Sequence, residues 1–262
     1  KPWCIIDPRM IELQKEFMDQ IWNHYNPYTK LQYKDDPVIA MSEIINECDL
    51  FQDSYSKKMT YQPENFYINE FRQKFKAWLE EKGIEFDWEN CDLYTTDEPM
   101  IRFKMDITKR YYAEMYDHMR SIGVKVPICC NNFSWSYLQC KAAHQNGDFM
   151  DSHLNVRFTH WEPHTRHWQD ISMHELPEWG AMRNARMRQF GKPFFTSEWD
   201  LTIPNKFRAE SSLMMAAIGC LQNWSGMTIH TYAYSSDLTT HMPLGRELST
   251  PVAGIPYREG IF

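Results

Sequence analysis

Several features that would assign a broad class are missing from this sequence. Its 262 residues contain no block of clustered Lys and Arg, and the formal net charge is −7. Phosphate binding needs concentrated positive charge, so we do not expect a nucleic acid as a partner. The sequence also lacks a signal peptide and a run of about eighteen apolar residues, so we expect neither a transmembrane helix nor a membrane partner. Its first residue is Lys1 rather than Met, and we expect a processed chain or a piece of a longer protein.

Motifs of several enzyme classes are missing as well. The sequence has no glycine-rich phosphate loop, no Gly-x-Ser-x-Gly elbow and no His-Glu-x-x-His pair, which argues against nucleotide-binding, serine-hydrolase and zinc-peptidase chemistry. Its seven cysteines form no Cys-x-x-Cys pair. An odd number leaves at least one thiol outside any internal disulfide, and the pattern is not typical of a disulfide scaffold. Cys129 and Cys130 are expected at a buried strand end.

Short apolar runs alternate with longer helical patterns along the chain. The spacing of apolar residues predicts helices over 11–25, 65–82, 101–122, 136–145, the second half of 171–190, and 208–224. Runs rich in β-branched and aromatic residues predict strands over 38–45, 124–130, 149–158, 192–198 and 227–234. Residues 1–10 and 161–170 are expected to be loops.

Five strands that alternate with helices, without hairpin signals between them, are typical of a parallel sheet in an α/β protein. No linker strong enough to divide the chain is present, so we expect one catalytic domain over residues 1–262. The segment 48–122 is longer than a single crossover helix, and we interpret it as a helical insertion within that domain.

Two glutamates lie at the ends of predicted strands. Glu47 ends the run VIAMSEIINE, directly after Asn46, and Glu198 ends the run KPFFTSE. In a parallel α/β barrel the C-terminal strand ends carry the active site. Cleavage of a glycosidic bond with retention needs two carboxyl groups about 5–5.5 Å apart, one as the nucleophile and one as the acid and then the base. The pair therefore predicts glycoside hydrolysis.

The Asn46-Glu47 pair, Glu198 and the stretch NPYTKLQYKDDPVIAMSEIINE resemble the clan of retaining glycoside hydrolases that includes family 5, the cellulases and mannanases. The resemblance extends from about Ile11 to Tyr234. It implies an eight-stranded (β/α)8 TIM barrel, of which this chain supplies roughly strands four to eight. A further segment or chain then completes the barrel, or the barrel is open, and we favour a piece of a longer protein. It implies Glu47 as the acid/base, Glu198 as the nucleophile and Asn46 as a contact to the sugar 2-hydroxyl. It further implies an oligosaccharide or polysaccharide substrate, no cofactor, no metal, and a secreted or periplasmic location.

Other side chains are expected to contact the sugar. His153 fits the His-x-Tyr pattern that family 5 often shows on strand six, whereas Asn155 replaces the tyrosine of that pattern. An aromatic ring matches the apolar face of a pyranose, and Trp161 directly follows strand six. Strand eight offers Tyr232 rather than the tryptophan of the family. The predicted substrate-binding residues are Asn46, Asn132, His153, Asn155, Trp161, Trp199 and Tyr232.

Three alternatives stay open at this point. A carbohydrate-binding protein on a degenerate barrel would keep the fold without cleavage, and Asn155 and the missing first strands motivate it. His160, His164 and His167 have spacings that zinc ligands adopt, which motivates a metal-dependent hydrolase, although Pro163 breaks any helix there. A transglycosylase would use the same two glutamates as the hydrolase.

Overall fold

The chain forms two compact units, Lys1–Met150 and Asp151–Phe262. The computed structural model describes residues 2–48, 50–51, 66–93, 97–132, 141, 145–156, 159–162, 165–168, 172–175, 181–201 and 206–229. The predicted helix over 136–145 lies almost wholly outside these residues. The prediction of one catalytic domain with an insertion at 48–122 stays a prediction.

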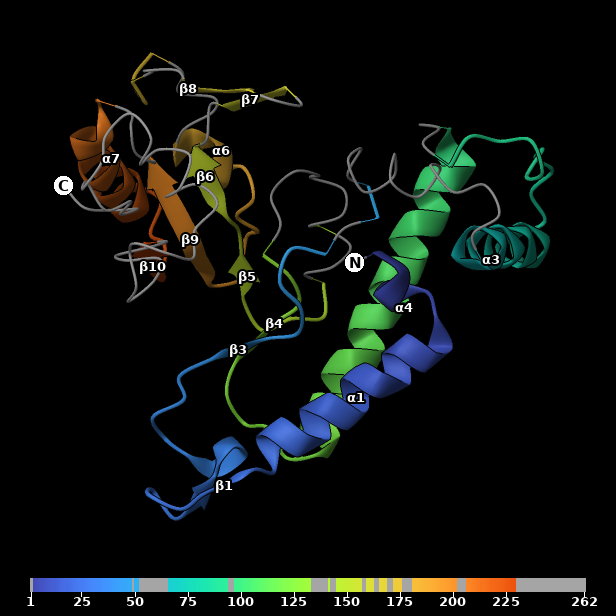
Figure 1. The fold of residues 1–262 in the computed structure, drawn as a ribbon, viewed down its shortest axis with the longest axis horizontal. Coiled ribbons are helices and arrows are strands. Elements are labelled where there is room, and N and C mark those ends of the chain that lie inside the picture. The colour runs from blue at the N-terminus through green and yellow to red at the C-terminus, as the bar shows by residue number, and fades with distance from the viewer. Residues whose placement is uncertain are drawn as a thin grey trace. The chain divides into compact units, whose positions relative to one another are not determined.

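The first unit contains three long helices: α1 Pro8–Trp22, α3 Phe66–Lys82 and α4 Glu98–Ser121 (Figure 1). The start of α1 differs from the prediction that residues 1–10 are a loop and that the helix covers 11–25. Asp7 caps the helix by accepting a hydrogen bond from the Met10 amide (2.7 Å), and Pro8 occupies the first turn, where it costs no hydrogen bond. A short 3-10 helix, η1 Pro2–Ile5, precedes this cap.

The predictions for α3 and α4 are confirmed, including where each helix stops. Gly83 and Gly123 follow the two helices with φ angles of +64° and +96°. This left-handed backbone is open to glycine without the steric cost that a side chain adds. In each case the helix therefore ends where the sequence places a glycine.

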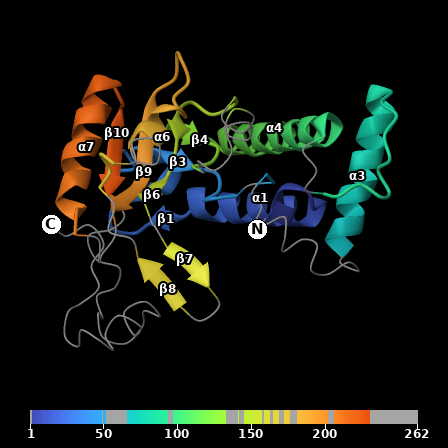
Figure 2. The same cartoon turned by 90° about the horizontal axis from the view of Figure 1, so that it is seen from above.

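The helices of the first unit enclose its main apolar core. α1 runs beside α4 in both views (Figures 1 and 2), and the two helices are joined by the ion pair Lys15–Glu114 (2.6 Å) and by a hydrogen bond between His118 Nε2 and Asp19 Oδ1 (3.0 Å). α3 also packs against α4. The largest fully buried side chains of this core include Phe71, Phe75, Met100, Tyr111, Tyr112 and Met115. This packing gives the strand ends of the unit a rigid support.

Strands in the first unit are shorter than predicted. β3 Ser42–Glu43 pairs in parallel with β4 Ile128–Cys129, where the sequence predicted strands over 38–45 and 124–130. The Asp36 carboxylate accepts a hydrogen bond from the Val38 amide (3.0 Å), and Val38 is 84% exposed. The chain is therefore still in a turn at Val38, and the apolar run becomes a strand only where β4 lies beside it.

A hairpin and a second 3-10 helix lie between α1 and β3. β1 Tyr25–Asn26 and β2 Leu31–Gln32 are antiparallel, and η2 Tyr33–Asp35 follows. The predicted helix thus ends three residues early, at Trp22, because Tyr25 already belongs to the hairpin.

The second unit is built on a parallel sheet. Its order is β10-β9-β5, and β6 also pairs with β9. The strands are β6 Leu154–Val156, β9 Phe194–Leu201, β10 Gly226–Ile229 and β5 Met150–Asp151, which includes the last residue of the first unit. β10 and β6 each run parallel to β9. The predicted strand over 149–158 is therefore interrupted at Ser152 and His153.

Two helices pack in the second unit. α7 Arg208–Leu221 contacts β9, and α6 Ala181–Ala185 contacts both α7 and β6 (Figures 1 and 2). α7 confirms the helix predicted over 208–224, whereas α6 ends at Ala185 and covers only part of the helix predicted in the second half of 171–190. The small apolar core of this unit contains Leu154, Met173, Trp199 and Met215.

The prediction of a loop over 161–170 is wrong for residues 161–162 and 165–168, the part of this segment that the structure describes. β7 Thr159–Glu162 and β8 Thr165–Trp168 form an antiparallel hairpin, in which His160 is the register partner of His167. Thr, His and Trp recur on both arms around a two-residue connection, which favours a hairpin over irregular structure. The density of His and Trp had suggested a loop, but these residues suit a strand.

The α/β class and the parallel pairing of the predicted strands are confirmed. In the part of the chain that the structure describes, the strands form separate sheets of two to four members and do not close into a barrel. Among the helices described, none combines the length and apolar character needed to cross a membrane.

Candidate active site

The first group of candidate residues surrounds Glu47, shortly after β3. Glu47 has a φ angle of 47°. This lies in the left-handed backbone region, which residues other than Gly, Asn and Asp seldom adopt. Its amide donates a hydrogen bond to the Asn132 side-chain oxygen (3.0 Å). An unusual backbone conformation is thus held by a side chain from a segment 85 residues further along the chain.

Asn132 connects three parts of this group. Besides accepting from the Glu47 amide, its amide nitrogen donates to Asn46 Oδ1 (2.6 Å) and to Glu43 Oε2 (2.8 Å). Asn132 itself is 1% exposed, so its side-chain amide is removed from water and would be costly to leave without hydrogen bonds. One side chain therefore positions the Asn46-Glu47 pair relative to the end of β3.

Asn131 likewise holds the main chain at Cys48. It donates to the Cys48 carbonyl (2.7 Å) and accepts from the Cys48 amide (3.4 Å). Both asparagines follow two buried cysteines, Cys129 at the end of β4 and Cys130 directly after it, and the predicted burial of this pair is confirmed. The Asn131-Asn132 pair thus holds the chain from position 46 to position 48.

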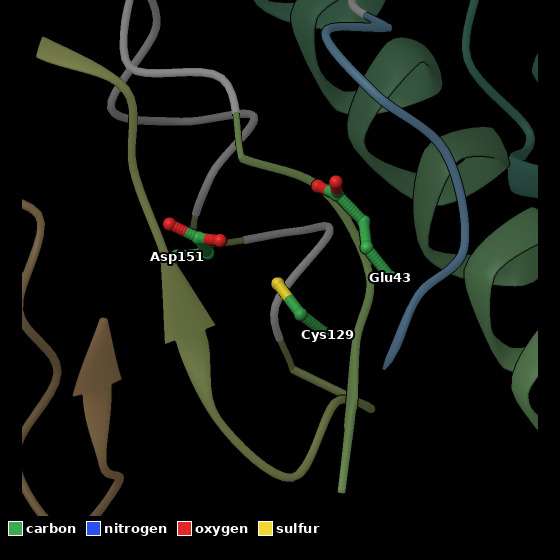
Figure 3. Close-up of side chains that lie close together, drawn as sticks. All are labelled: Glu43, Cys129 and Asp151. Atoms are coloured by element: carbon green, nitrogen blue, oxygen red, sulfur yellow. The ribbon is translucent and has the colours of Figure 1, made fainter. Parts of the chain in front are cut away.

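Glu43 is a candidate that the sequence analysis missed. It ends β3 and is the register partner of Cys129 on β4, and the two side chains project from neighbouring strands (Figure 3). A signal was present, because Glu43 is the only charged residue in the apolar run 38–45. A carboxylate and a thiol are two ligands, short of the four that a structural zinc site needs.

The second group surrounds Glu198 on β9. Between the pairs Thr196–Met227 and Trp199–Ile229, β9 contributes Ser197 and Glu198 whereas β10 contributes a single residue. The strand therefore carries an irregularity at Glu198, of the bulge type that redirects a side chain near functional sites. Glu198 lies inside β9 rather than at the predicted end of the strand, since β9 continues to Leu201.

His153 links Glu198 to its neighbour Ser197. The imidazole Nδ1 lies 3.2 Å from Glu198 Oε2, and Nε2 lies 3.1 Å from Ser197 Oγ. An ionised carboxylate can only accept, so this arrangement suits an imidazole that donates from Nδ1, and in that neutral tautomer Nε2 accepts from the Ser197 hydroxyl. His153 is 6% exposed, so the imidazole is fixed by its surroundings and in turn orients the carboxylate.

Asp151 binds the main chain beside His153 and Glu198. Its Oδ1 accepts hydrogen bonds from the amides of Ser152 (2.7 Å) and Ser197 (2.8 Å). Burial raises the pKa of this carboxyl, and the hydrogen bonds from Ser197 oppose that rise without cancelling it. Asp151, the third side chain drawn in Figure 3, belongs to the second unit, and no recognised motif marked it in the sequence.

The remaining predicted residues have different settings. Trp199 is buried, in the apolar core of the second unit. Asn155 lies in β6 and Trp161 in β7, and their register positions alone are described. Tyr232 lies outside the described residues. Within the first unit the structure brings together Asn46, Glu47 and Asn132, and within the second His153 and Glu198; the roles assigned to all these residues stay predictions.

Comparison with known proteins gives a likeness of fold. No protein-family profile matches the sequence, and no curated protein matches it. A hyperthermostable endo-1,4-β-D-mannanase from Thermotoga petrophila RKU-1 is similar in structure, with a TM-score of 0.52 and 14% identity over 86% of this chain and 55% of the mannanase. An endo-1,4-β-mannanase from Rhizomucor miehei has the same score and identity over 95% of this chain and 64% of its own.

A glycoside hydrolase family 5 mannosidase from Rhizomucor miehei is also similar, with a TM-score of 0.52 and 13% identity over 86% of this chain and 47% of the mannosidase. The chain spans less than two thirds of the length of each of these structures. It thus has a mixed α/β fold that resembles part of the family 5 barrels, which confirms the resemblance seen in the sequence at the level of fold.

Proposed function

We propose that the chain carries the two catalytic glutamates of a retaining glycoside hydrolase that cleaves a β-linked glycan. The observation that carries the proposal is the setting of Glu198, which lies on an irregular stretch of a parallel strand with its carboxylate 3.2 Å from a buried imidazole. A carboxylate aimed in this way is what a nucleophile requires. The fold likeness to family 5 enzymes adds to this support.

In the proposed mechanism the Glu198 carboxylate attacks the anomeric carbon while the Glu47 carboxyl protonates the leaving oxygen. A covalent glycosyl-enzyme forms and the leaving sugar departs. Glu47, now ionised, removes a proton from water, which attacks the anomeric carbon and releases Glu198. Asn46 binds the sugar 2-hydroxyl, and Asn132 sets the position of both Asn46 and Glu47. No step needs a cofactor.

His153 keeps the nucleophile in one orientation. The Nδ1–H bond to Glu198 and the bond of Nε2 to Ser197 fix the imidazole at both nitrogens. In family 5 a tyrosine two residues further on often orients the nucleophile, and this chain has Asn155 there. We propose that His153 takes over that task.

The substrate class proposed first is mannan, because the structures of similar fold are named as mannanases and a mannosidase. The test treats the protein, expressed from its full reading frame, with 2-deoxy-2-fluoro glycosyl fluorides of the manno, gluco and galacto series. Each reagent traps a glycosyl-enzyme on a retaining nucleophile. We expect the manno reagent to label the tryptic peptide 189–206, with the added mass on Glu198.

Labelling by the gluco or galacto reagent instead would keep the retaining mechanism and replace mannan as the substrate class. Labelling on a residue other than Glu198 would contradict the assignment of the nucleophile. A folded protein that no reagent labels, but that still binds oligosaccharide by calorimetry, would favour the non-catalytic carbohydrate-binding protein.

A further inference from the structure

Two cysteines of the first unit lie in contact although they are far apart in the sequence. Cys4 Sγ and Cys48 Sγ are 3.5 Å apart, and the residues are separated by 44 positions. A disulfide bond is about 2.05 Å long, so the two sulfur atoms are in contact without a bond between them. An approach of roughly 1.5 Å would join them, a distance that side-chain rotation covers.

The main chain on the Cys4 side is fixed. Cys4 belongs to η1, and its carbonyl accepts a hydrogen bond from Gln14 Nε2 of α1 (3.0 Å). The preceding Trp3 stacks on Tyr67 of α3, with ring centroids 5.4 Å apart and planes inclined by 17°. η1 is thus attached to two helices of the core.

The main chain on the Cys48 side is fixed as well. Asn131 binds both the amide and the carbonyl of Cys48, and the Tyr112 hydroxyl donates to the same carbonyl (3.4 Å). The Cys48 side chain is fully buried. The two thiols are therefore presented to each other by rigid supports, which raises the effective concentration of one at the other.

We propose that Cys4 and Cys48 form a disulfide bond by exchange with a small-molecule disulfide of the glutathione type. The partly exposed Cys4 reacts first: its thiolate attacks one sulfur of the small disulfide, forms a mixed disulfide and releases one thiolate. The Cys48 thiolate then attacks Cys4 Sγ and displaces the second small thiolate. The two cysteines lose two protons and two electrons, and the small disulfide is reduced to two thiols.

Cys91 and Cys220, two other thiols in the described part of the chain, lie in surroundings that favour disulfide formation less than those of Cys4 and Cys48. Cys91 contacts the Trp88 carbonyl (3.4 Å) and Arg72 Nη1 (3.9 Å), and burial raises its pKa, so less of it is thiolate. Cys220 is exposed on α7 of the second unit and serves as an internal control for reaction at the surface.

The bond ties η1 to the residue directly after Glu47. It therefore closes a covalent loop around α1, β1, β2 and β3, whose unfolded form loses conformational freedom. The existence of the bond does not depend on the proposed function. Its effect on activity does, because only a catalytic Glu47 makes the position of this segment matter for turnover.

The experiment equilibrates the protein with an excess of oxidised glutathione, alkylates remaining thiols under denaturing conditions and maps tryptic peptides. Cys4 and Cys48 fall in the peptides 1–9 and 35–57, each with a single cysteine. We expect these two peptides to appear as one linked species that separates on reduction. The midpoint of thermal unfolding rises in the linked protein and returns on reduction.

Two variants serve as controls. Cys4→Ser removes the linked species and the response of the unfolding midpoint to oxidant, whereas Cys220→Ser leaves both unchanged. A link between peptides 35–57 and 126–141, the second of which contains Cys129, Cys130 and Cys140, would overturn the pairing. Stable glutathione adducts on Cys4 without a linked peptide would overturn it too, because Cys48 would then fail to reach Cys4.

Discussion

Glu47 and Glu198 are supported in different ways by their two units. At Glu47 the Asn132 side chain binds the main chain, and the backbone is held in the left-handed region. At Glu198 the His153 imidazole binds the carboxylate itself, and the backbone is part of a strand. The first arrangement fixes the main chain of Glu47, and the second fixes the carboxylate of Glu198.

The difference suits the two roles proposed. A nucleophile must point at one carbon atom, so a direct hydrogen bond to its carboxylate is useful. An acid/base gives up a proton and takes one from another direction, so its carboxyl has to change partners during the cycle. The contrast also separates two kinds of variant, namely those that remove a carboxyl and those that loosen its support.

The largest effect is expected when the carboxyls are removed. Glu198→Gln lowers kcat by roughly 10⁴-fold or more, because the covalent step loses its nucleophile. Glu47→Gln lowers kcat by about 10²–10⁴-fold on substrates with a poor leaving group, which is the usual contribution of a general acid. Initial rates on aryl glycosides with leaving groups of increasing acidity measure the contrast.

In that series we expect the glycosylation rate of Glu47→Gln to recover as the leaving group becomes more acidic, whereas the rate of Glu198→Gln stays low. Equal slopes for the two variants would contradict the assigned roles. Glu175→Gln is the matched control, since Glu175 is an exposed carboxyl of the second unit and its loss should leave rates unchanged.

A smaller loss is expected from His153→Ala. A hydrogen bond to a charged group contributes about 1.5–3 kcal/mol, so kcat falls by roughly 10- to 100-fold while KM changes little. Steady-state kinetics measure the split, and His174→Ala, at an exposed position of the same unit, is the control. A rise in KM at unchanged kcat would indicate instead that His153 binds substrate.

Asn132→Ala is expected to act on stability as well as on rate. It removes the buried amide that accepts from the Glu47 main chain and donates to Asn46 Oδ1, and the lost hydrogen bonds cost about 1–3 kcal/mol. Thermal unfolding should show a midpoint lower by several degrees. Asn90→Ala, whose side chain bonds Asp87 at the surface, should shift the midpoint far less.

The smallest effect is expected from Asp151→Asn, and it depends on pH. The amide oxygen still accepts from Ser152 and Ser197, but the side chain no longer ionises. Because burial raises the pKa of Asp151 above its ordinary value of 3.8, the folded wild type loses stability as pH rises from that value through the raised pKa. The variant does not lose this stability.

Unfolding midpoints of Asp151→Asn and wild type, measured across acid to neutral pH, test the sign. We expect the unfolding midpoint of the variant to rise relative to that of the wild type as pH rises through this window. Above the window the difference between the two midpoints should stay constant. A difference that shrinks with rising pH would show that ionised Asp151 stabilises the fold.

Helices were predicted better from the sequence than strands were. The ends of α3 and α4 were marked by Gly83 and Gly123, whose local conformational preference needs no partner. Strand length depends on what lies alongside: the apolar run 38–45 pairs only at Ser42 and Glu43, where β4 is present. Periodicity within one segment does not contain that information.

The same reason explains which candidate residues were found. Glu47 and Glu198 stand in a recognisable pattern, and His153 fits part of one. Glu43 and Asp151 belong to no motif. Glu43 matters because it binds Asn132, which is distant in the sequence. Asp151 matters because it binds the main-chain amides of Ser152 and Ser197. Such contacts become visible only once the strands are placed side by side.

The left-handed backbone at Glu47 has a consequence for protein engineering. Glycine adopts that conformation without steric cost, whereas glutamate bears a cost of about 1–2 kcal/mol. A library screened for heat resistance alone would therefore enrich glycine or asparagine at position 47 and discard the proposed acid/base. Selection on this scaffold should reward turnover from the first round, because thermal robustness and chemistry favour different residues at this position.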